Sequence, residues 1–252
     1  MGQKLVLIDG HSILNRAFYG VPDLSNSQGL HTNAVYGFLN IMFKIVEEEK
    51  PDYLTVAFDV HAPTFRHEIY KEYKGTRKPM PEELREQVPV MKQMLRAMGI
   101  CIVEKAGLEA DDILGTIAKR GEREGMEVAL VSGDRDLLQV ASEHIKIRIP
   151  KTRGGRTEIE DYYAKDVEAR YQVTPQQFID LKALMGDTAD NIPGVPKVGE
   201  KTATDLMVRF GSLEGIYEHI EEVTKKAVKE SLLCNRELAD LSRTLATINV
   251  TS

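Results

Sequence analysis

The chain has 252 residues, 42% of them hydrophobic and 29% charged, which excludes a disordered protein and allows one large domain or two modest ones. Its formal net charge of −6 and isoelectric point near 5.6 argue at first against a nucleic-acid partner. No apolar run approaches the roughly 20 residues that cross a bilayer, and the run from Leu5 to Ile8 is too short for a signal peptide. We therefore expect no membrane partner. Cys101 and Cys234 are far apart and predict reduced thiols in a cytoplasmic protein.

Three short apolar runs in the first half of the chain predict buried parallel strands. The runs are KLVLID at 4–9, YLTVAFD at 53–59 and EVALVSGD at 127–134. Amphipathic stretches between them predict helices. These stretches cover 34–50, 82–98 and 110–124, the last followed by Gly125 as a C-cap. The alternation predicts an α/β fold with a mainly parallel central sheet flanked by helices.

The chain changes character after about residue 160. From Ala164 onward it looks helical and contains one loop, DNIPGVPKVGEKTA, between helical stretches. A strand signal returns only in LATINV, at 245–250, which predicts one short strand segment. We expect a single compact molecule with an α/β part over 1–160 and a mainly helical part over 161–252.

An aspartate closes each of the three predicted strands: Asp9, Asp59 and Asp134. The carboxyl ends of strands in an open α/β sheet form its ligand site, so these acids should converge. Their mutual repulsion favours a cation between them. Taken singly, each aspartate is better explained as a turn or N-cap residue. The coincidence of three is what supports a site.

Further acids occur in three short clusters. LEADDIL opens a helix, SGDRD follows the third strand, and GDTADN precedes the Pro-Gly loop. Helix capping explains one or two acids in a first turn, but not three in four residues. With the three strand-end aspartates they make nine candidate metal ligands: Asp9, Asp59, Glu109, Asp111, Asp112, Asp134, Asp136, Asp187 and Asp190.

These acids predict a site for Mg²⁺, with Mn²⁺ as a substitute, because the candidate ligands are hard oxygens without a histidine or cysteine pattern beside them. Two such ions roughly 3.5–4 Å apart can activate a water and stabilise the leaving oxygen of a phosphodiester. The sequence contains no EF-hand loop, so a calcium sensor is excluded. The acids therefore indicate metal-assisted hydrolysis by two ions.

A basic segment, FRHEIYKEYKGTRK, follows the second strand and has five Lys or Arg against two Glu. Its cations could hold phosphates above the metal site, and an aromatic ring among them could stack on a base. A solvated helix face is the more common explanation of a basic run. The candidate DNA contacts in this segment are Arg66, Tyr73, Lys74, Arg77 and Lys78.

The Pro-Gly loop IPGVPKVGEKTA, at 192–203, predicts two helices joined by a tight turn. Its glycines permit the turn and a close backbone approach, and the following helix N-terminus could bind a phosphate. A bare turn between helices explains the spacing equally well. The candidate contacts are Gly194, Lys197, Gly199, Lys201 and Thr202.

In combination these motifs resemble the 5′ nuclease domain at the N-terminus of bacterial DNA polymerase I, which is related to phage and eukaryotic flap endonucleases. The resemblance covers nearly the whole chain. It rests on LIDGHSILNRAFYG, AVYGFL, FDVHAPTFRHEIYKEYKGTRKPMP, GLEADDILGTIA, SGDRDLLQ, LMGDTADNIPGVPKVGEKTA and LATI.

The resemblance implies a PIN-like nuclease fold with a helical arch over 62–100 and a helix-hairpin-helix over 184–210. It implies a 5′–3′ exonuclease and flap endonuclease of DNA replication and repair, which leaves a 5′-phosphate and a 3′-hydroxyl. Its partners would be DNA with a 5′ flap, nick or 5′ end and a polymerase, tethered or separate. We expect a monomer associated with the nucleoid in the cytoplasm.

The resemblance also implies roles for individual residues. Lys74 and Arg77 would contact the scissile phosphate as catalytic residues, and Tyr73 would stack on a base. Arg16 would bind substrate near the site, and K⁺ would assist the hairpin. The first metal would take Asp9, Asp59, Glu109, Asp111, Asp112 and Asp134. Asp136, Asp187 and Asp190 would complete the second.

The chain departs from the family pattern in two respects. Helix-hairpin-helix loops usually read Gly-hydrophobic-Gly, but this loop reads Lys197, Val198, Gly199, which leaves the turn geometry open. No polymerase or proofreading part is present, so both an excised domain and a freestanding exonuclease remain open.

Other classes fit less well. A PIN-type ribonuclease would be shorter and lack the hairpin and basic arch. A non-catalytic DNA-junction scaffold would have lost acids of the second site, and Asp187 and Asp190 are present. A haloacid dehalogenase phosphatase needs D-x-D after the first strand, and a nucleotide-binding protein needs a glycine-rich phosphate loop. Neither motif occurs.

Overall fold

A computed structural model, which describes residues 2–153 and 156–251, contains a six-stranded sheet with the order β3-β2-β1-β4-β5-β6. The strands are β1 (Lys4–Asp9), β2 (Tyr53–Ala57), β3 (Cys101–Val103), β4 (Glu127–Val131), β5 (Ile145–Arg153) and β6 (Arg156–Tyr162). The first five run parallel, and β6 pairs antiparallel with β5. The predicted mainly parallel α/β sheet is thus confirmed.

Strand β1 forms the centre of the sheet because its residues are apolar toward both faces. Leu5 and Leu7 belong to one hydrophobic core, and Val6 and Ile8 to the other. Successive side chains of a strand point to opposite faces, so a continuous apolar run buries itself on both sides. All four side chains are buried, which fixes β1 between β2 and β4.

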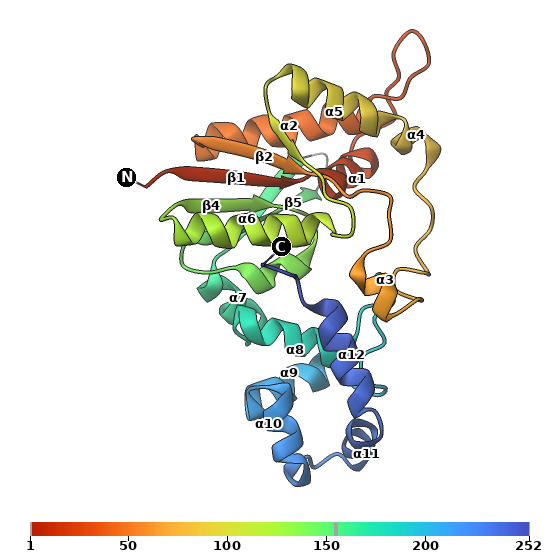
Figure 1. Cartoon of the computed structure of the whole chain (residues 1–252), viewed down its shortest axis with the longest axis vertical. Helices are drawn as coiled ribbons and strands as arrows, with labels where there is room; N and C mark the ends of the chain where they lie inside the picture. Colours follow the sequence, from red (N-terminus) through yellow and green to blue (C-terminus); the bar gives the residue numbers. More distant parts are fainter. Residues whose placement is uncertain (1, 154–155, 252) are drawn as a thin grey trace.

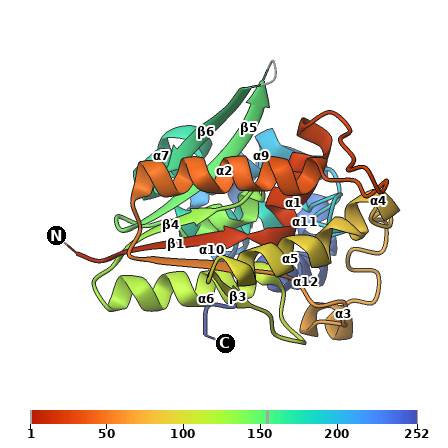
Figure 2. The ribbon, with the colours of Figure 1, turned by 90° about the horizontal axis from the view of Figure 1, so that it is seen from above.

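Helices cover both faces of the sheet (Figure 1). One core packs against α1 (Gly10–Gly20), α2 (Asn33–Glu49) and α5 (Gln87–Ala97), and the other against α6 (Ala110–Arg123) and the C-terminal helices. Figure 2 shows α2 and α6 on opposite sides of the strands. The remaining elements of the first part are α3 (Phe65–Ile69), α4 (Glu82–Arg85) and the 3₁₀ helix η1 (Arg135–Val140).

The C-terminal part is helical, as predicted from Ala164 onward. None of the described helices is both long enough and apolar enough to cross a membrane. The elements of the C-terminal part are α7 (Ala164–Tyr171), α8 (Pro175–Met185), α9 (Glu200–Phe210), α10 (Leu213–Glu218), the 3₁₀ helix η2 (Ile220–Glu222), α11 (Lys226–Cys234) and α12 (Arg236–Ala246).

The loop between α8 and α9 brings two backbone segments into close contact. Gly186 and Gly194 both have positive φ, and a Cβ on Gly194 would lie 2.4 Å from the amide nitrogen of Gly186. Only glycine fits such an approach. Lys197 also adopts a left-handed φ of 67°, at the position where the family pattern has glycine. Gly199 is the extended N-cap of α9 and has free space around it, so the backbone does not require glycine there.

The structure adds strands that the sequence did not predict and removes one that it did. The β5–β6 hairpin and the three-residue β3 were missed. The LATINV segment is not a strand: α12 continues to Ala246, and the chain then extends without pairing to any described strand. Its backbone groups bond to Gln139 instead, which donates to the Ala246 carbonyl and accepts from the Ile248 amide. Side-chain partners therefore replace a ladder.

Arg66, expected to bind DNA, lies instead in the interior with 1% of its surface exposed. Its guanidinium donates to both oxygens of Asp112 at 2.8 Å and to the carbonyls of Leu245 and Thr247 at 2.9 and 2.8 Å. The expected DNA contact of Arg66 was wrong. The basic pattern of the segment is typical of a surface, but Arg66 is buried and links α3, α6 and the C-terminal segment.

We predict that Arg66→Ala lowers the free energy of unfolding by about 3–5 kcal/mol, because it leaves the fully buried Asp112 carboxylate without its charge partner. Urea denaturation measures the change. Lys71→Ala, an exposed cation of the same segment, should stay within about 0.5 kcal/mol of the parent. A stable Arg66→Ala variant with weakened DNA binding would restore the original expectation.

Candidate active site

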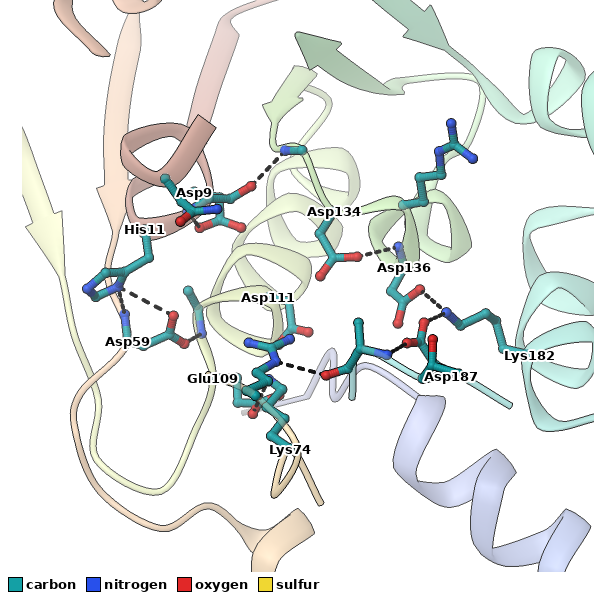
Figure 3. A pocket seen from close by; sticks show the side chains of 18 of the residues that line it. Asp9, His11, Asp59, Lys74, Glu109, Asp111, Asp134, Asp136, Lys182 and Asp187 are labelled. Atoms are coloured by element: carbon teal, nitrogen blue, oxygen red, sulfur yellow. Dashed lines mark hydrogen bonds and ion pairs between the residues drawn. The ribbon is translucent and has the colours of Figure 1, made fainter. Parts of the chain in front are cut away.

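The carboxyl ends of the parallel strands open into a cavity of about 880 Å³. The strand-end aspartates Asp9, Asp59 and Asp134 line it, as strand geometry predicted. Figure 3 shows these side chains turned toward a common space, with acids from α6 and from the segment after α8. The cavity is lined by seven of the nine predicted acids: Asp9, Asp59, Glu109, Asp111, Asp134, Asp136 and Asp187.

Asp9 is held in place by its neighbours at the sheet edge. Its carboxylate accepts hydrogen bonds from the Ser12 amide at 3.0 Å and the Ser132 hydroxyl at 2.8 Å. Burial, and next the charge of Asp59, raise the pKa of Asp9 to about 6. The same Ser132 oxygen accepts the Asp134 amide at 3.0 Å, so one hydroxyl orients two of the acids.

Asp59 differs from Asp9 because it has polar partners of its own. The Ala110 amide donates to it at 2.8 Å, and His11 Nδ1 lies 3.4 Å from its Oδ2. Burial alone would raise the pKa of Asp59, but His11 and the Ala110 amide outweigh burial and lower it. Asp59 therefore carries its negative charge readily, while Asp9 does so at a cost.

The first turn of α6 contributes a compact group of three acids. Ligand oxygens of Glu109, Asp111 and Asp112 lie within 4.8 Å of one another. Oδ1 of Asp111 is buried without a hydrogen-bond partner among the described residues. Burial, and then the charges of Glu109 and Asp112, raise the pKa of Asp111. A buried oxygen without a donor fits a cation at this point, and hard oxygen ligands fit Mg²⁺.

Asp112 belongs to this group of three acids, but its oxygens already accept hydrogen bonds from the protein. Its carboxylate is fully buried and does not line the cavity. Besides Arg66, it accepts the amides of Glu109 at 3.2 Å and Asn249 at 2.8 Å. All its hydrogen-bonding capacity is thus used within the protein, and Asp112 supports the α6 turn from behind.

The opposite wall carries Asp134, Asp136 and Asp187. The Asp136 amide caps onto Asp134 at 2.8 Å, which brings the two acids together. Burial, and then the charge of Asp134, raise the pKa of Asp136 to about 7. Burial alone would raise the pKa of Asp187, but the ammonium of Lys182 lowers it, helped by the amides of Asp190 at 3.1 Å and Ala189 at 2.7 Å.

Lys182, from α8, is a residue of the site that the sequence interpretation missed. Its ammonium lies 2.9 Å from Asp136 and bonds to Asp187, although only 6% of the residue is exposed. The available signal was its position: Lys182 falls on the helical face shared by Phe178, Leu181 and Met185, which also line the cavity. A lysine within an apolar stripe indicates a buried charge with a partner.

The basic segment lies over the acids, as expected from its place after the second strand. Lys74 has a left-handed φ of 55°, and its ammonium lies 2.6 Å from Glu109 and 4.0 Å from Asp190. Arg77 forms an ion pair with Asp190. The Lys74 amide donates to the Asp190 carbonyl at 2.8 Å, which ties the two loops together. Lys74, Arg77 and Lys78 all line the cavity.

Tyr73 cannot stack on a base in this structure, because only 3% of it is exposed. Its hydroxyl donates to Glu109 at 3.0 Å and lies 3.3 Å from Asp190. The stacking expectation was wrong: the ring is part of the support under the acids. Asp190 is likewise mostly buried, does not line the cavity and bonds to Arg77 and Tyr73.

The predicted contacts of the hairpin lie outside this cavity. Lys197 and Lys201 are exposed, Thr202 is half-buried and Gly194 is buried beside α12, where its amide donates to Ser242 at 2.9 Å. Among the residues at the start of α9, Glu200 lines the cavity. The hairpin is therefore a separate surface beside the carboxylates.

Two family models together match nearly the whole chain. A family model described as the 5′-3′ exonuclease N-terminal resolvase-like domain matches residues 4–172, and one described as the 5′-3′ exonuclease C-terminal SAM fold matches residues 173–252. The chain is 51% identical to DNA polymerase I of Bacillus caldotenax and 50% identical to that of Bacillus subtilis, over 98% of its length in each case. It spans 28% of the length of these relatives.

Solved structures share the fold. The T5 5′-exonuclease with bound zinc superposes with a TM-score of 0.79 at 24% identity, over 98% of this chain and 90% of that one. The catalytic core of Rad2 in complex with a DNA substrate superposes with a TM-score of 0.60 at 14% identity, over 100% and 81%. These likenesses confirm the predicted fold.

We predict that Mg²⁺ raises the melting temperature more at pH 8 than at pH 5. Folded-state pKa values near 6 for Asp9 and near 7 for Asp136 exceed that of an unfolded aspartate. The protonated forms of these two acids therefore stabilise the folded protein. This contribution is complete below the unfolded pKa and is lost as pH rises through the folded-state values, where the acids become charged and Mg²⁺ can compensate them. Melting in EDTA and in Mg²⁺ across this range measures the effect, and equal gains at both pH values would contradict it.

Asp111→Asn sharpens this test. The variant removes one of three closely packed acids. In EDTA at pH 8 it should raise the free energy of unfolding by ~1 kcal/mol, and the melting temperature with it. The gain in melting temperature from Mg²⁺ should be smaller than in the parent. Asp205→Asn, the same change at an exposed position of α9, should alter neither quantity.

Proposed function

The chain belongs to the 5′-3′ exonuclease family of nucleases, and we propose that it hydrolyses DNA phosphodiesters at 5′ flaps, nicks and 5′ ends with two Mg²⁺ ions. The observation that carries the proposal is the cavity itself, where seven carboxylates from five segments face Lys74, Arg77 and Lys182. Acids in such number, with a buried oxygen that lacks a donor, fit divalent cations. The products would be a 5′-phosphate and a 3′-hydroxyl.

The carboxylates of the cavity would bind the two ions in two groups. Asp9, Asp59, Glu109, Asp111 and Asp134 would hold one ion, and Asp134, Asp136 and Asp187 the other. When bound, the ions would supply an activated water and stabilise the leaving oxygen.

Lys74 and Arg77 would orient the scissile phosphate and bear part of the charge that develops on it. In this structure both cations bond to acids, Lys74 to Glu109 and Arg77 to Asp190. A metal ion on Glu109 would free Lys74 for a phosphate oxygen, and the half-exposed Arg77 would exchange Asp190 for the phosphate. Lys182 would keep Asp136 and Asp187 from repelling each other.

The surroundings of the site complete the proposal. The exposed Lys197 and Lys201 beside α9 would hold duplex backbone, and the family resemblance alone supports K⁺ there. Residues 62–100 would form the arch over the cavity, since Lys74 and residues 76–81 line it. We propose a cytoplasmic protein that acts on nucleoid DNA as a monomer and, as in the relatives named DNA polymerase I, together with a polymerase.

Cleavage of an end-labelled 5′-flap DNA with and without Mg²⁺ tests this function. We expect cutting near the junction only with metal, and at least ~100-fold slower cutting by Asp134→Ala, which removes the acid that both proposed ions share. No metal-dependent cutting by the parent protein would overturn the enzyme assignment. Cleavage of a single-stranded RNA of the same sequence, in place of the flap DNA, would favour the ribonuclease alternative.

A second prediction concerns Lys74. If its ammonium acts on the phosphate in the transition state, Lys74→Ala should lower kcat by roughly 10²–10³-fold while the Kd for DNA changes much less. Lys71→Ala, an exposed lysine of the same segment that does not line the cavity, should leave both nearly unchanged. A parallel loss of kcat and affinity in Lys74→Ala would indicate a general DNA contact.

A further inference from the structure

Tyr19 is the most exposed large hydrophobic side chain among the described residues, with 70% of its surface accessible. It lies in the last turn of α1 and lines the same cavity as Asp9 and Asp134. Its ring packs edge-on against Phe18, with centroids 5.0 Å apart and an interplanar angle of 83°. This contact leaves most of the Tyr19 surface accessible to a ligand.

The helical spacing explains why this ring faces the site. Ile13, Leu14 and Ala17 bury one side of α1 against the sheet. Asn15 and Tyr19 lie four residues apart on the other side and both line the cavity. Tyr19 also lines a smaller hollow beside it, together with Ser12, Asn15, Arg16, Gly20 and Gly133.

Two cations accompany Tyr19, and in the described part of the chain neither is within ion-pair distance of a carboxylate, although the charge of Arg135 helps to lower the pKa of Glu160. The guanidinium of Arg16 lies across Gly133, where a Cβ would be only 3.0 Å from Nη2, and its Nε is buried with no hydrogen bond to any described residue. Arg135, exposed on the rim of the main cavity, forms no ion pair with any described residue. Burial, and then the charge of Arg135, lower the pKa of Arg16, so the two guanidinium groups act on each other. Adjacent cations beside an acidic cavity fit a bound phosphate.

We propose that Tyr19 and Arg135 complete a nucleotide subsite with Arg16, which the resemblance already assigns to the substrate: the ring stacks on a base next to the scissile phosphate and the arginines bind a backbone phosphate. The subsite rests on the proposed nuclease function and assigns to Tyr19 the stacking that Tyr73 cannot provide. An aromatic ring beside paired cations is the arrangement that binds single-stranded nucleic acid without sequence preference.

The test uses a 5′-flap DNA with 2-aminopurine on either side of the scissile phosphate, and Ca²⁺ in place of Mg²⁺ with a gel to confirm that the DNA is intact. Binding of the parent protein should change the fluorescence of one probe through stacking. Tyr19→Phe should preserve this change. Tyr19→Ala should abolish it and raise Kd roughly 5- to 150-fold, the range that corresponds to one lost base–aromatic stack.

Two further variants separate the subsite from general effects. Tyr53→Ala removes a tyrosine, 47% exposed, at the start of β2, the end of the sheet away from the carboxylates, and should leave both quantities unchanged. Arg135→Ala should lower the slope of log Kd against log salt by about one, while Tyr19→Ala should leave that slope unchanged. Arg135→Lys should keep the slope of the parent.

The outcomes are distinguishable. Parent protein that neither binds nor cuts flap DNA would overturn the proposed function and the subsite with it. Parent protein that binds and cuts, with Tyr19→Ala showing the same fluorescence change and Kd, would overturn the subsite alone. Melting curves of each variant establish that a loss does not come from unfolding.

Discussion

Mutual repulsion among carboxylates is the constraint on which this molecule depends. Seven acids face one cavity, and burial makes each uncompensated charge costly. The compensating cations come from remote elements: Arg66 from α3, Lys74 from the loop after it, and Lys182 from α8. Each cation fastens its own segment to the end of the sheet. The same cations therefore balance the charge of the site and hold the two parts of the chain together.

Strand geometry made part of this site predictable. Asp9, Asp59 and Asp134 follow apolar runs, and parallel strands must bring such residues to one edge. The burial of Arg66 and Tyr73 was not predictable, because it depends on Asp112, Glu109 and Asp190, which lie far away in the sequence. Nothing in the local pattern distinguishes a basic strip on the surface from one that is half inside.

The missed strands have a similar physical origin. In β5, the inward side chains alternate with Lys146 and Arg148, so the segment IKIRIPKTR reads as polar. These cations pair with Glu49 on α2 and Asp161 on β6. A charged strand is stable in this position because its partners are supplied by other elements. The short β3 has only three residues, too few to show any period.

The bonds of Arg66 to the last turn of α12 also bear on how the protein is made. Its acceptors at Leu245 and Thr247 lie 179 and 181 residues further along the chain. Ribosomes deliver a protein from its N-terminus, and parts fold as they emerge. Arg66 and Asp112 must therefore wait until these two carbonyls, about 180 residues later, have been synthesised. A nascent chain that has not passed Thr247 leaves this buried guanidinium short of acceptors, so an ordered carboxylate edge requires translation beyond that residue.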